Sequence, residues 1–588
     1  MTNNSKKLFG RLFFLFLILI SIFLTYYCHK KSGYYNWKSE IWADKAGYYI
    51  YLPSFFMYHF DASKCPENID EKVGYGFIID RENNKILTKY TYGVAALVSP
   101  FFILARIVSP VFQAPGEGGF GPMFHFMVNM AAIFYLILGL FFLKKFLEYY
   151  FKFALTYILL LLVYAGTNLL FYSVSDTLMS HVYSFFLFTV FLYSMKKYLE
   201  EPGKWLYFIL LSVAFGMTVL IRPTNGILIL LFFFWDCLNR EDIMKRIRLF
   251  FRPERLVVFL AVLFIIFLPQ MIYWKYSHGT FITWTYANEG FTNWNHPKIL
   301  ELWFSTISGL FLYSPLVLLM IVGMIIMIIR KIPNGWLSLV LFFLISYIFS
   351  SWYCWYFGCS YGQRSFVEYY SVFIIPLGFF ILEIPKIMNH FFKNLLILLI
   401  VAFSYYNVKM ILEFEKCFFG STWDWAQFGR QLDKAHIFSS YQKEWSFKND
   451  FENGAISYTN RISDTIHRSG MHSLQILPYK ENTPCYSILM SDFGEKLPQY
   501  IDVDFWVLNP VSQPVDASLA CSMDINDSVV AWQSKAVPSL INKPSIWQKV
   551  HSRFVIPAGM TRKTNIRIYF WNPKKASFFV DDLNIEFN

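Results

Sequence analysis

Two carboxylates near the N-terminus, Glu40 and Asp44, have the type and spacing of an acid–base site. They follow the first long apolar run, in a segment rich in tyrosine and tryptophan. On a helix, residues four apart lie on the same face, so we expect both carboxylates to point to one side. A carboxylate that takes the proton of an attacking hydroxyl accelerates a reaction by about 10²–10⁴-fold. The pair therefore predicts a catalytic base, with Asp44 as the first candidate and Glu40 as the second.

Cationic side chains that suit a phosphate lie at the ends of later apolar runs. Arg364 is the first candidate and Arg222 the second, because a planar guanidinium donates two parallel hydrogen bonds to phosphate oxygens. Lys89, Lys275 and His181 are further candidates for the same pocket. Ionisable groups near membrane spans are costly to bury and are therefore candidates for function. The plainer interpretation is that these residues anchor helix ends at the lipid headgroups.

The composition indicates which elements must position these residues. Of 588 residues, 56% are hydrophobic and 16% are charged, whereas soluble domains have about 45–50% apolar and about 25% charged residues. A helix needs about 20 apolar residues to cross the hydrocarbon core. Runs of that kind lie near 9–26, 122–143, 153–171, 178–195, 205–221, 224–239, 256–273, 303–329, 335–352, 366–385 and 394–412. We therefore predict a multi-span α-helical membrane protein with about eleven transmembrane helices, and a helix at the interface over 91–112.

The distribution of Lys and Arg predicts the orientation of the chain. Basic loops alternate with loops that carry few cations, and the basic ones are 144–152, 196–204, 240–255, 330–331 and 386–393. Such loops collect in the cytoplasm, so we expect a cytoplasmic N-terminus, with 27–121 and everything after 412 on the outer side. The net charge of +12 then mostly reflects topology, and nucleic acid is not an expected partner. In a bacterium this predicts an inner-membrane protein whose C-terminal domain is periplasmic.

After residue 412 the pattern changes to short alternating strands separated by Pro, Asn, Ser and Gly. In "YIDVDFWVL" (500–508), apolar side chains alternate with Asp502, Asp504 and Trp506, which is typical of a half-buried strand. Several such strands at short intervals favour a sandwich or barrel. We predict a linker over 413–445 and an all-β sandwich over 446–588.

Several motifs accompany the acidic residue that follows the first span. They are "DKAGYYIYLP" (44–53), "KYTYGVAAL" (89–97), "SDTLMSHVYSFFLF" (175–188), "IRPTNGILI" (221–229), "GLFLYSP" (309–315) and "YGQRSFVEYY" (361–370). With the long first outer loop and the number of spans, they resemble the GT-C superfamily of membrane glycosyltransferases, in particular the branch of the protein O-mannosyltransferases and the lipid A aminoarabinose transferase. The resemblance implies a GT-C-like transmembrane domain over 1–412, with interfacial helices in 27–121. The Glu-x-x-x-Asp spacing departs from the Asp-Asp or Glu-x-Asp pairs of several members.

The resemblance also implies a reaction. The donor would be a sugar on polyprenyl phosphate, because nucleotide sugars are not available outside the inner membrane. A hexose or pentose would pass to a protein, lipid or glycan acceptor at the periplasmic face by one inverting displacement, with Asp44 as base and the arginines at the donor phosphate. Segment 273–298 would form a lid over the site. GT-C members differ in their use of a divalent metal, so metal dependence stays open.

Two other classes of protein fit the same membrane domain. The alternative is a transporter or flippase for lipid-linked sugars that carries an envelope-binding β-domain. A third is a scaffold without chemistry.

Three C-terminal fragments, "FENG" (451–454), "HRSGMHSLQI" (467–476) and "IYFWNPKKASFFVDDLNI" (568–585), resemble the jelly-roll family of carbohydrate-binding modules. In that family a structural calcium often joins an early acidic residue to an Asp of the last strand, and Glu452 and Asp582 stand in those places. Such modules stack exposed aromatic rings on sugars, for which the candidates are Trp506, Trp532 and Trp547. The alternative is a spacer or folding partner whose tryptophans lie in the core.

Overall fold

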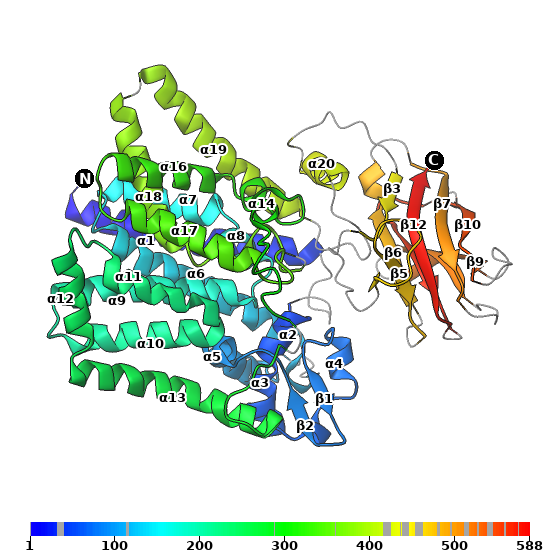
Figure 1. Ribbon diagram of the computed structural model, residues 1–588, viewed down its shortest axis with the longest axis horizontal. Coiled ribbons are helices and arrows are strands. Elements are labelled where there is room, and N and C mark those ends of the chain that lie inside the picture. The colour runs from blue at the N-terminus through cyan, green and yellow to red at the C-terminus, as the bar shows by residue number, and fades with distance from the viewer. Residues whose placement is uncertain are drawn as a thin grey trace. The chain divides into compact units, whose positions relative to one another are not determined.

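The structure of the protein, a computed structural model, divides into two compact units (Figure 1). The helical unit consists of Met1–Ser305, Gly309–Trp355 and Tyr361–Leu412, and the strand-rich unit consists of Thr306–Ser308, Tyr356–Ser360 and Glu413–Asn588. The residues described are 2–31, 40–112, 117–286, 289–358, 360–387, 389–414, 425–435, 437, 446–452, 462–478, 482–493, 497–510, 517–525, 528–537, 545–557, 560–573 and 576–588. Asn453 and Gly454 of the "FENG" fragment therefore lie outside the described residues.

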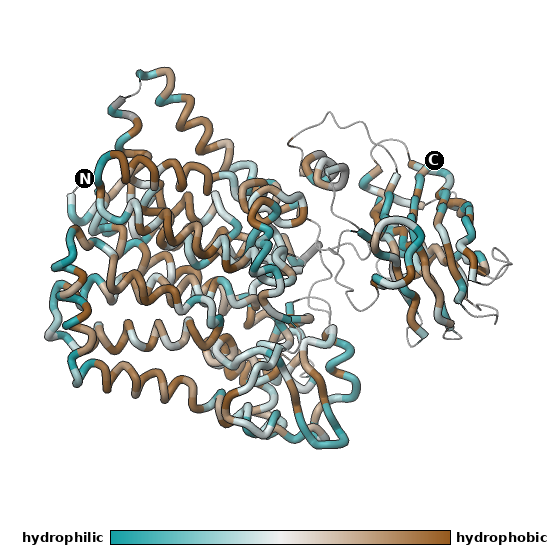
Figure 2. The backbone as a smooth tube through the Cα atoms, viewed as in Figure 1, coloured by the Kyte–Doolittle hydropathy of each residue, from teal (hydrophilic) through white to brown (hydrophobic). Residues whose placement is uncertain are grey.

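The helical unit is built from long apolar helices that run roughly parallel to one another (Figures 1 and 2). The longest are α1 (Asn3–Lys31), α6 (Pro122–Leu147), α7 (Phe153–Ala165), α9 (Ser180–Glu200), α10 (Trp205–Ile221), α13 (Pro253–His278), α16 (Leu316–Ile329), α17 (Gly335–Ser350), α18 (Tyr370–Ile387) and α19 (His390–Glu413). Shorter helices are α8 (Leu169–Val174), the 3-10 helix η4 (Pro223–Leu228), α11 (Ile229–Phe234), α12 (Arg240–Phe250), α14 (Ile299–Phe304), α15 (Leu310–Tyr313) and the 3-10 helix η5 (Arg364–Phe366).

The predicted first outer loop forms a small subdomain at one end of these helices (Figure 1). Its elements are α2 (Asp44–Tyr49), α3 (Tyr51–Pro53), the π-helix η1 (Ser54–Tyr58), η2 (Ala62–Lys64), α4 (Ile69–Lys72), the antiparallel hairpin β1 (Ile78–Asp80) and β2 (Lys85–Leu87), α5 (Gly93–Val108) and η3 (Glu117–Gly119). The helix expected near 91–112 is therefore present as α5.

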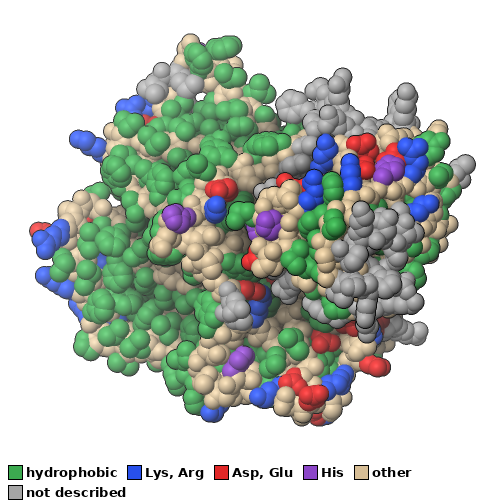
Figure 3. Space-filling model, turned by 45° about the vertical axis from the view of Figure 1, so that its right-hand side comes forward, with side chains coloured by type: hydrophobic (Ala, Val, Ile, Leu, Met, Phe, Trp, Pro, Cys, Tyr) green, Lys and Arg blue, Asp and Glu red, His purple; other side chains and the backbone are tan. Residues whose placement is uncertain are grey.

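Apolar helices of the expected kind fill the unit, as the composition predicts. Within the described residues, four are long and apolar enough to cross a membrane, at Asn3–His29, Glu117–Leu147, Pro253–His278 and His390–Glu413. Their outward side chains are apolar, for example Ile265 of α13, which is 67% exposed, and green apolar side chains cover much of the helical surface in Figure 3. A large exposed apolar surface is typical of proteins that contact a membrane or another protein there. The number of eleven spans remains a prediction.

The single span expected over 303–329 is wrong. The segment forms three helices, and α15 ends at Tyr313 because Ser314 has non-helical dihedral angles (φ −136°, ψ 67°). The next residue, Pro315, disfavours a helical conformation in the residue before it and has no N–H to donate. Helix α16 then starts at Leu316.

Several loops that are predicted to lie on the same side of the membrane contact one another. Asp236 accepts hydrogen bonds of 2.6 Å from Tyr150, Lys196 and Asn334, which come from three different predicted inner loops. At the opposite end, predicted outer loops meet through charged pairs such as Lys45 with Asp176. In Figure 1, α12 lies at the first end and α2 at the other.

The strand-rich unit is an antiparallel β-sandwich, so the predicted all-β fold is confirmed. Its strands are β3 (Ser446–Asn449), β4 (Ile462–Ser463), β5 (Ser473–Ile476), β6 (Asn482–Leu489), β7 (Tyr500–Leu508), β8 (Ser518–Ile525), β9 (Ser528–Ala536), β10 (Gln548–Val555), β11 (Asn565–Trp571) and β12 (Phe578–Phe587). One sheet has the order β10-β7-β12-β5-β4, with β3 also paired to β12, and the other has β6-β11-β8-β9. The predicted alternation in β7 is correct, since Ile501, Val503, Phe505 and Val507 are all fully buried. The predicted linker contains a helix, α20 (Trp425–Lys434).

The two ends of the helical unit should lie on opposite sides of the membrane. We expect a membrane-impermeant maleimide, added to cells with a permeabilised outer membrane, to label Glu82→Cys in the β1–β2 turn and not Glu241→Cys in α12. Both positions are exposed, so access through the membrane decides the result. Peptide mass spectrometry at each substituted position measures it, and labelling of both positions after detergent is the control. Equal labelling in intact cells would contradict the topology.

Candidate functional site

Asp44 is the first residue of α2 and faces Arg364. Its Oδ2 lies 3.4 Å from Nη2 of Arg364, and the Asp44 side chain is 43% exposed. Burial by itself lowers the pKa of Arg364, but the Asp44 carboxylate and nearby tyrosine hydroxyls together outweigh this, and the pKa lies above its ordinary value. A solvent-accessible carboxylate is therefore paired with a largely buried guanidinium that is 320 residues away in the sequence.

The expectation that Glu40 and Asp44 share a helix face is wrong. Residues 40–43 are not helical, and Ala43 has a left-handed φ of 49°. The backbone N–H of Ala43 instead donates to the carbonyl of Val73 at 2.8 Å. Packing against the turn that follows α4 therefore delays the start of the helix to Asp44.

Glu40 lies in a buried cluster of charges. Its Oε1 accepts from the backbone N–H of Leu178 at 3.0 Å and from Nζ of Lys45 at 3.4 Å, and its Oε2 lies 3.4 Å from Nε2 of His29. Lys45 also donates to Asp176 at 2.8 Å. Burial by itself would lower the pKa of Lys45, but Asp176 and Glu40 raise it above its ordinary value. The cluster fixes α2 to the loop before α9, and so fixes Asp44.

Two glycines allow α2 to lie this close to its neighbours. A Cβ on Gly47 would lie 2.3 Å from the carbonyl oxygen of Gly76, and a Cβ on Gly76 would lie 1.8 Å from that of Ala43. Any side chain at either position would push α2 away from the turn that contains Gly76.

Arg222 belongs to a second buried cluster. Its Nη1 lies 3.0 Å from Nδ1 of His181 and 3.8 Å from Oε1 of Glu368. Oε2 of Glu368 lies 3.2 Å from the same nitrogen of His181, and Asn225 donates to Oε1 at 2.9 Å. His181 and Glu368 are both fully buried. The sequence analysis did not select Glu368, although it lies in the motif "YGQRSFVEYY" that pointed to Arg364.

The tyrosine Tyr48 connects the two arginines with Asp44. Burial raises the pKa of its hydroxyl, Arg222 lowers it, Asp44 raises it, and Arg364 lowers it. All three charges thus act on one buried hydroxyl. The structure therefore places Asp44 in contact with Arg364, and places Arg222 within electrostatic reach of the same tyrosine hydroxyl.

The two candidate lysines, Lys89 and Lys275, have different surroundings. Nζ of Lys89 is 2.6 Å from Oε1 of Glu289 and 5.3 Å from the centre of the Tyr286 ring. Lys89 also lines a pocket that Asp44 lines as well. Lys275 donates to the carbonyl of Gly279 at 2.8 Å, at the end of its own helix. Lys89 thus lies beside the site, whereas the contact of Lys275 is a helix cap.

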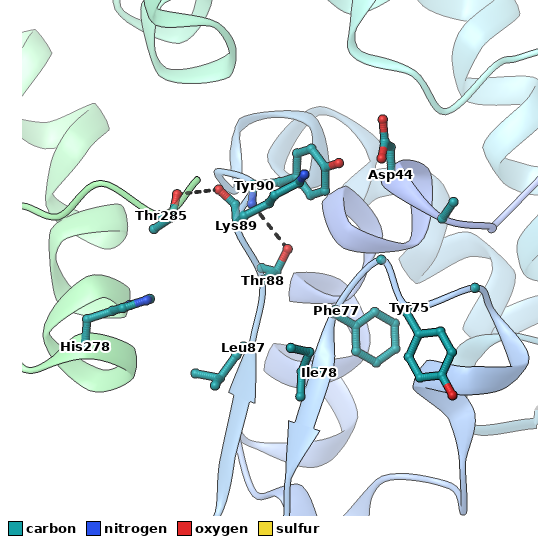
Figure 4. Close-up of a pocket in the computed structure, with 13 residues that line it drawn as sticks. Asp44, Tyr75, Phe77, Ile78, Leu87, Thr88, Lys89, Tyr90, His278 and Thr285 are labelled. Carbon is teal, nitrogen blue, oxygen red and sulfur yellow. Dashed lines mark hydrogen bonds between the residues drawn. The ribbon is translucent and has the colours of Figure 1, made fainter. Parts of the chain in front are cut away.

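The pocket has a volume of about 390 Å³ (Figure 4). Its lining comes from the start of α2, the turn after α4, the β1–β2 hairpin with the residues that follow it, and the end of α13 with the segment after it. The lining residues are Ala43, Asp44, Gly74, Tyr75, Gly76, Phe77, Ile78, Leu87, Thr88, Lys89, Tyr90, His278 and Thr285. The predicted lid, 273–298, supplies His278 and Thr285, and Thr285 donates to the carbonyl of Lys89 at 2.6 Å. The pocket is the size of a small-molecule site.

The tryptophans expected to bind sugar have three different environments. The guanidinium of Arg468 lies 3.7 Å from the centre of the Trp506 ring and covers it. Trp547 is half-buried before β10. Trp532 of β9 is 44% exposed, donates to the Tyr569 hydroxyl at 2.7 Å, and meets Trp571 edge to face. Tyr569 and Trp571 were not selected from the sequence.

Glu452 and Asp582 hold one loop from two sides. Glu452 accepts from the backbone N–H groups of Met471 and His472 at 2.7 and 2.9 Å. Asp582 accepts from the hydroxyl of Ser469 at 2.8 Å and from Arg468. Among the described residues, no three His, Cys, Asp or Glu side chains come together as a metal site. The structural calcium remains a prediction.

The ion pairs of Lys45 should contribute to the stability of the fold, whereas Asp44 should contribute little to it. Removing one partner of a buried ion pair costs about 3–5 kcal/mol, because it leaves an uncompensated charge. We expect Lys45→Met to lower the free energy of unfolding by roughly this amount, seen as a lower melting temperature of the purified protein in detergent. Asp44→Asn is the matched control and should melt like the wild type. Equal melting of all three proteins would contradict the structural role of Lys45.

Comparisons with known proteins give distant similarities. The CBM22-2 xylan-binding domain of Paenibacillus barcinonensis Xyn10C is 16% identical, with a TM-score of 0.18, over 24% of this chain and 99% of that domain. The apo oligosaccharyltransferase of Archaeoglobus fulgidus is 12% identical, with a TM-score of 0.39, over 68% of this chain and 55% of that chain. Both likenesses are too weak to carry an argument about activity. No protein-family model matches the sequence. No curated protein matches it either.

Proposed function

We propose that this protein is an integral-membrane glycosyltransferase. It transfers a hexose or pentose from a polyprenyl-phosphate-linked donor to an acceptor at the periplasmic face of a bacterial inner membrane. The observation that supports this most is the contact of the half-exposed Asp44 carboxylate with Arg364, beside Arg222 and a pocket. A base next to two phosphate-binding cations is the set of groups that such a transfer needs.

The proposed reaction is a single displacement. The acceptor hydroxyl loses its proton to Asp44 as its oxygen forms a bond to the anomeric carbon of the donor sugar. The bond from that carbon to the phosphate oxygen breaks on the opposite side, and the electron pair leaves with the phosphate, so the configuration inverts. Charge grows on that phosphate, where Arg364 and Arg222 donate hydrogen bonds. No general acid is needed, because the leaving phosphate is stable as an anion.

The two arginines have different roles in this proposal: Arg222 is held by the protein, and Arg364 exchanges its contact with Asp44 for the donor phosphate. Glu368 and His181 contact Arg222 within the protein, so the position of its guanidinium does not depend on a bound substrate. Arg364 contacts Asp44 at 3.4 Å. A donor phosphate that binds Arg364 competes with this contact and frees the carboxylate to accept a proton. In this scheme the donor binds first.

The β-sandwich holds a glycan in this proposal. Trp532 supports it best, because it is exposed and is positioned by Tyr569 and Trp571. Trp506 is a weaker candidate, since Arg468 already covers its ring.

Asp44→Asn should separate catalysis from donor binding. We expect it to abolish sugar transfer and, because Arg364 loses its competitor, to tighten binding of undecaprenyl phosphate to the protein in nanodiscs. Arg364→Gln should weaken the same binding by about tenfold or more, as a charged hydrogen bond contributes about 1.5–3 kcal/mol. Transfer is measured by mass spectrometry of the product and binding by thermophoresis. Glu82→Gln, an exposed carboxylate of the same loop, is the control.

Other outcomes would overturn the proposal. Transfer retained by Asp44→Asn would exclude it as the base. Movement of lipid-linked sugar between leaflets by the wild type, without any transfer, would favour a flippase, which needs cations for the phosphate but no base.

Glycan binding by the sandwich should depend on Trp532 and much less on Trp506. We expect Trp532→Ala in the full chain to lose several-fold in affinity on a glycan array, because it removes an exposed stacking surface. Trp506→Ala is the matched control. Equal losses, or none, would contradict this assignment.

A further inference from the structure

The pocket beside Asp44 has one carboxylate rim and an apolar floor. Phe77, Ile78 and Leu87 form the floor, while Asp44 and Lys89 lie along the upper side in Figure 4. His278 lies on the left of the view and points toward its centre (Figure 4). The base that the proposed reaction uses thus lines a cavity that also has apolar lining residues.

The charges at this pocket are paired within the protein. Lys89 lies 2.6 Å from Glu289, and Asp44 lies 3.4 Å from Arg364. Once a donor phosphate occupies Arg364, the lysine left at the pocket is Lys89, which Glu289 already compensates. A neutral second ligand needs no cation there, whereas an anionic one would. The charge pattern therefore favours a neutral, hydroxyl-bearing ligand.

Tyr75 is held in a strained conformation at the edge of the pocket. Its φ is 55°, a left-handed value that is uncommon for an aromatic residue. The backbone N–H of Tyr75 donates to the carbonyl of Asp70 at 2.7 Å, which fixes the turn. Its side chain nevertheless remains 58% exposed, as does that of Ile78. Backbone strain of this kind is found at ligand sites.

The hairpin next to the pocket does not offer an open edge to a peptide strand. The N–H groups of Ile86 and Thr88 donate to the hydroxyls of Tyr276 and Tyr273 at 3.0 and 2.8 Å. On the other strand, the N–H of Ile79 donates to Asp70 at 3.2 Å. Binding of an extended peptide by strand addition needs such groups to be available. The hairpin therefore favours a ligand that is not an extended peptide.

We propose that this pocket binds the acceptor, and that the acceptor group is a neutral pyranose. One hydroxyl of the ring lies at the Asp44 carboxylate, and the C–H face of the ring packs on Ile78 and Leu87 beside Tyr75. A pyranose has both surfaces, an apolar face and a rim of hydroxyls. This inference rests on the proposed function, because it assigns the second substrate of the same reaction. The ring comes from a soluble glycan or from a glycolipid headgroup.

The test measures access to one position on the pocket floor. Ile78→Cys in the full chain in nanodiscs is treated with N-ethylmaleimide, and alkylation of the introduced thiol is followed by peptide mass spectrometry. The probes are maltotriose, cellotriose and chitotriose for the soluble arm, and glucosyl diacylglycerol in the nanodisc for the lipid arm. A Ser/Thr-containing hexapeptide and undecaprenyl phosphate are the comparison probes. Phe55→Cys, at a similarly exposed position outside the pocket, is the matched control.

We expect at least one sugar probe to slow alkylation several-fold at position 78 and not at position 55. Protection of the thiol by a soluble oligosaccharide would identify a soluble glycan as the source of the ring. Protection by glucosyl diacylglycerol would identify a glycolipid headgroup. Adding Tyr75→Ala should raise the sugar concentration needed, while adding Phe55→Ala should not. Protection by the hexapeptide alone, by undecaprenyl phosphate, or by no probe would overturn the inference. Failure of the proposed function is separate, since it appears as absent sugar transfer by the wild type whatever the alkylation result.

Discussion

The ammonium of Lys45 lies between the carboxylates of Glu40 and Asp176, and the position of the candidate site depends on this contact. None of the three charges is more than slightly exposed. An isolated charge in such surroundings is strongly unfavourable, so each requires the others. The contact joins the start of α2 to the loop before α9. Asp44, one residue from Lys45, is held in place without being buried itself.

This arrangement separates the charges that stabilise the fold from those that are available for chemistry. Glu40, Glu368 and His181 are fully buried and face other side chains. Asp44 is half-exposed and faces a pocket on one side and Arg364 on the other. In the proposed reaction the donor phosphate lies on the arginine side and the acceptor on the pocket side. Asp44 lies between them, where a base for the acceptor hydroxyl is needed.

The β-sandwich also separates the side chains that stabilise the fold from those that are available for binding. Alternating apolar side chains fill its core, and the outward positions are left to hydrogen-bonded and aromatic groups. Trp506 and Trp532 both occupy outward positions, but Arg468 covers the first and leaves the second exposed. Register alone places a side chain on a face, and the neighbouring side chains decide whether that face can bind anything.

The sequence by itself determined the membrane-type helices, the change to strands after residue 412 and the residue types of the site. These depend on local patterns, namely runs of apolar residues and the alternation in β7. Two expectations were wrong: the helix through Glu40, which the contact of Ala43 with Val73 prevents, and the unbroken span over 303–329, which is interrupted at Ser314 and Pro315. Only the tertiary structure brought Lys45 to Asp176 and Asp44 to Arg364, across separations of 131 and 320 residues. It also revealed Glu368 and the pocket. Buried charges are stabilised by partners distant in the chain, and no local pattern records which partner the fold will supply.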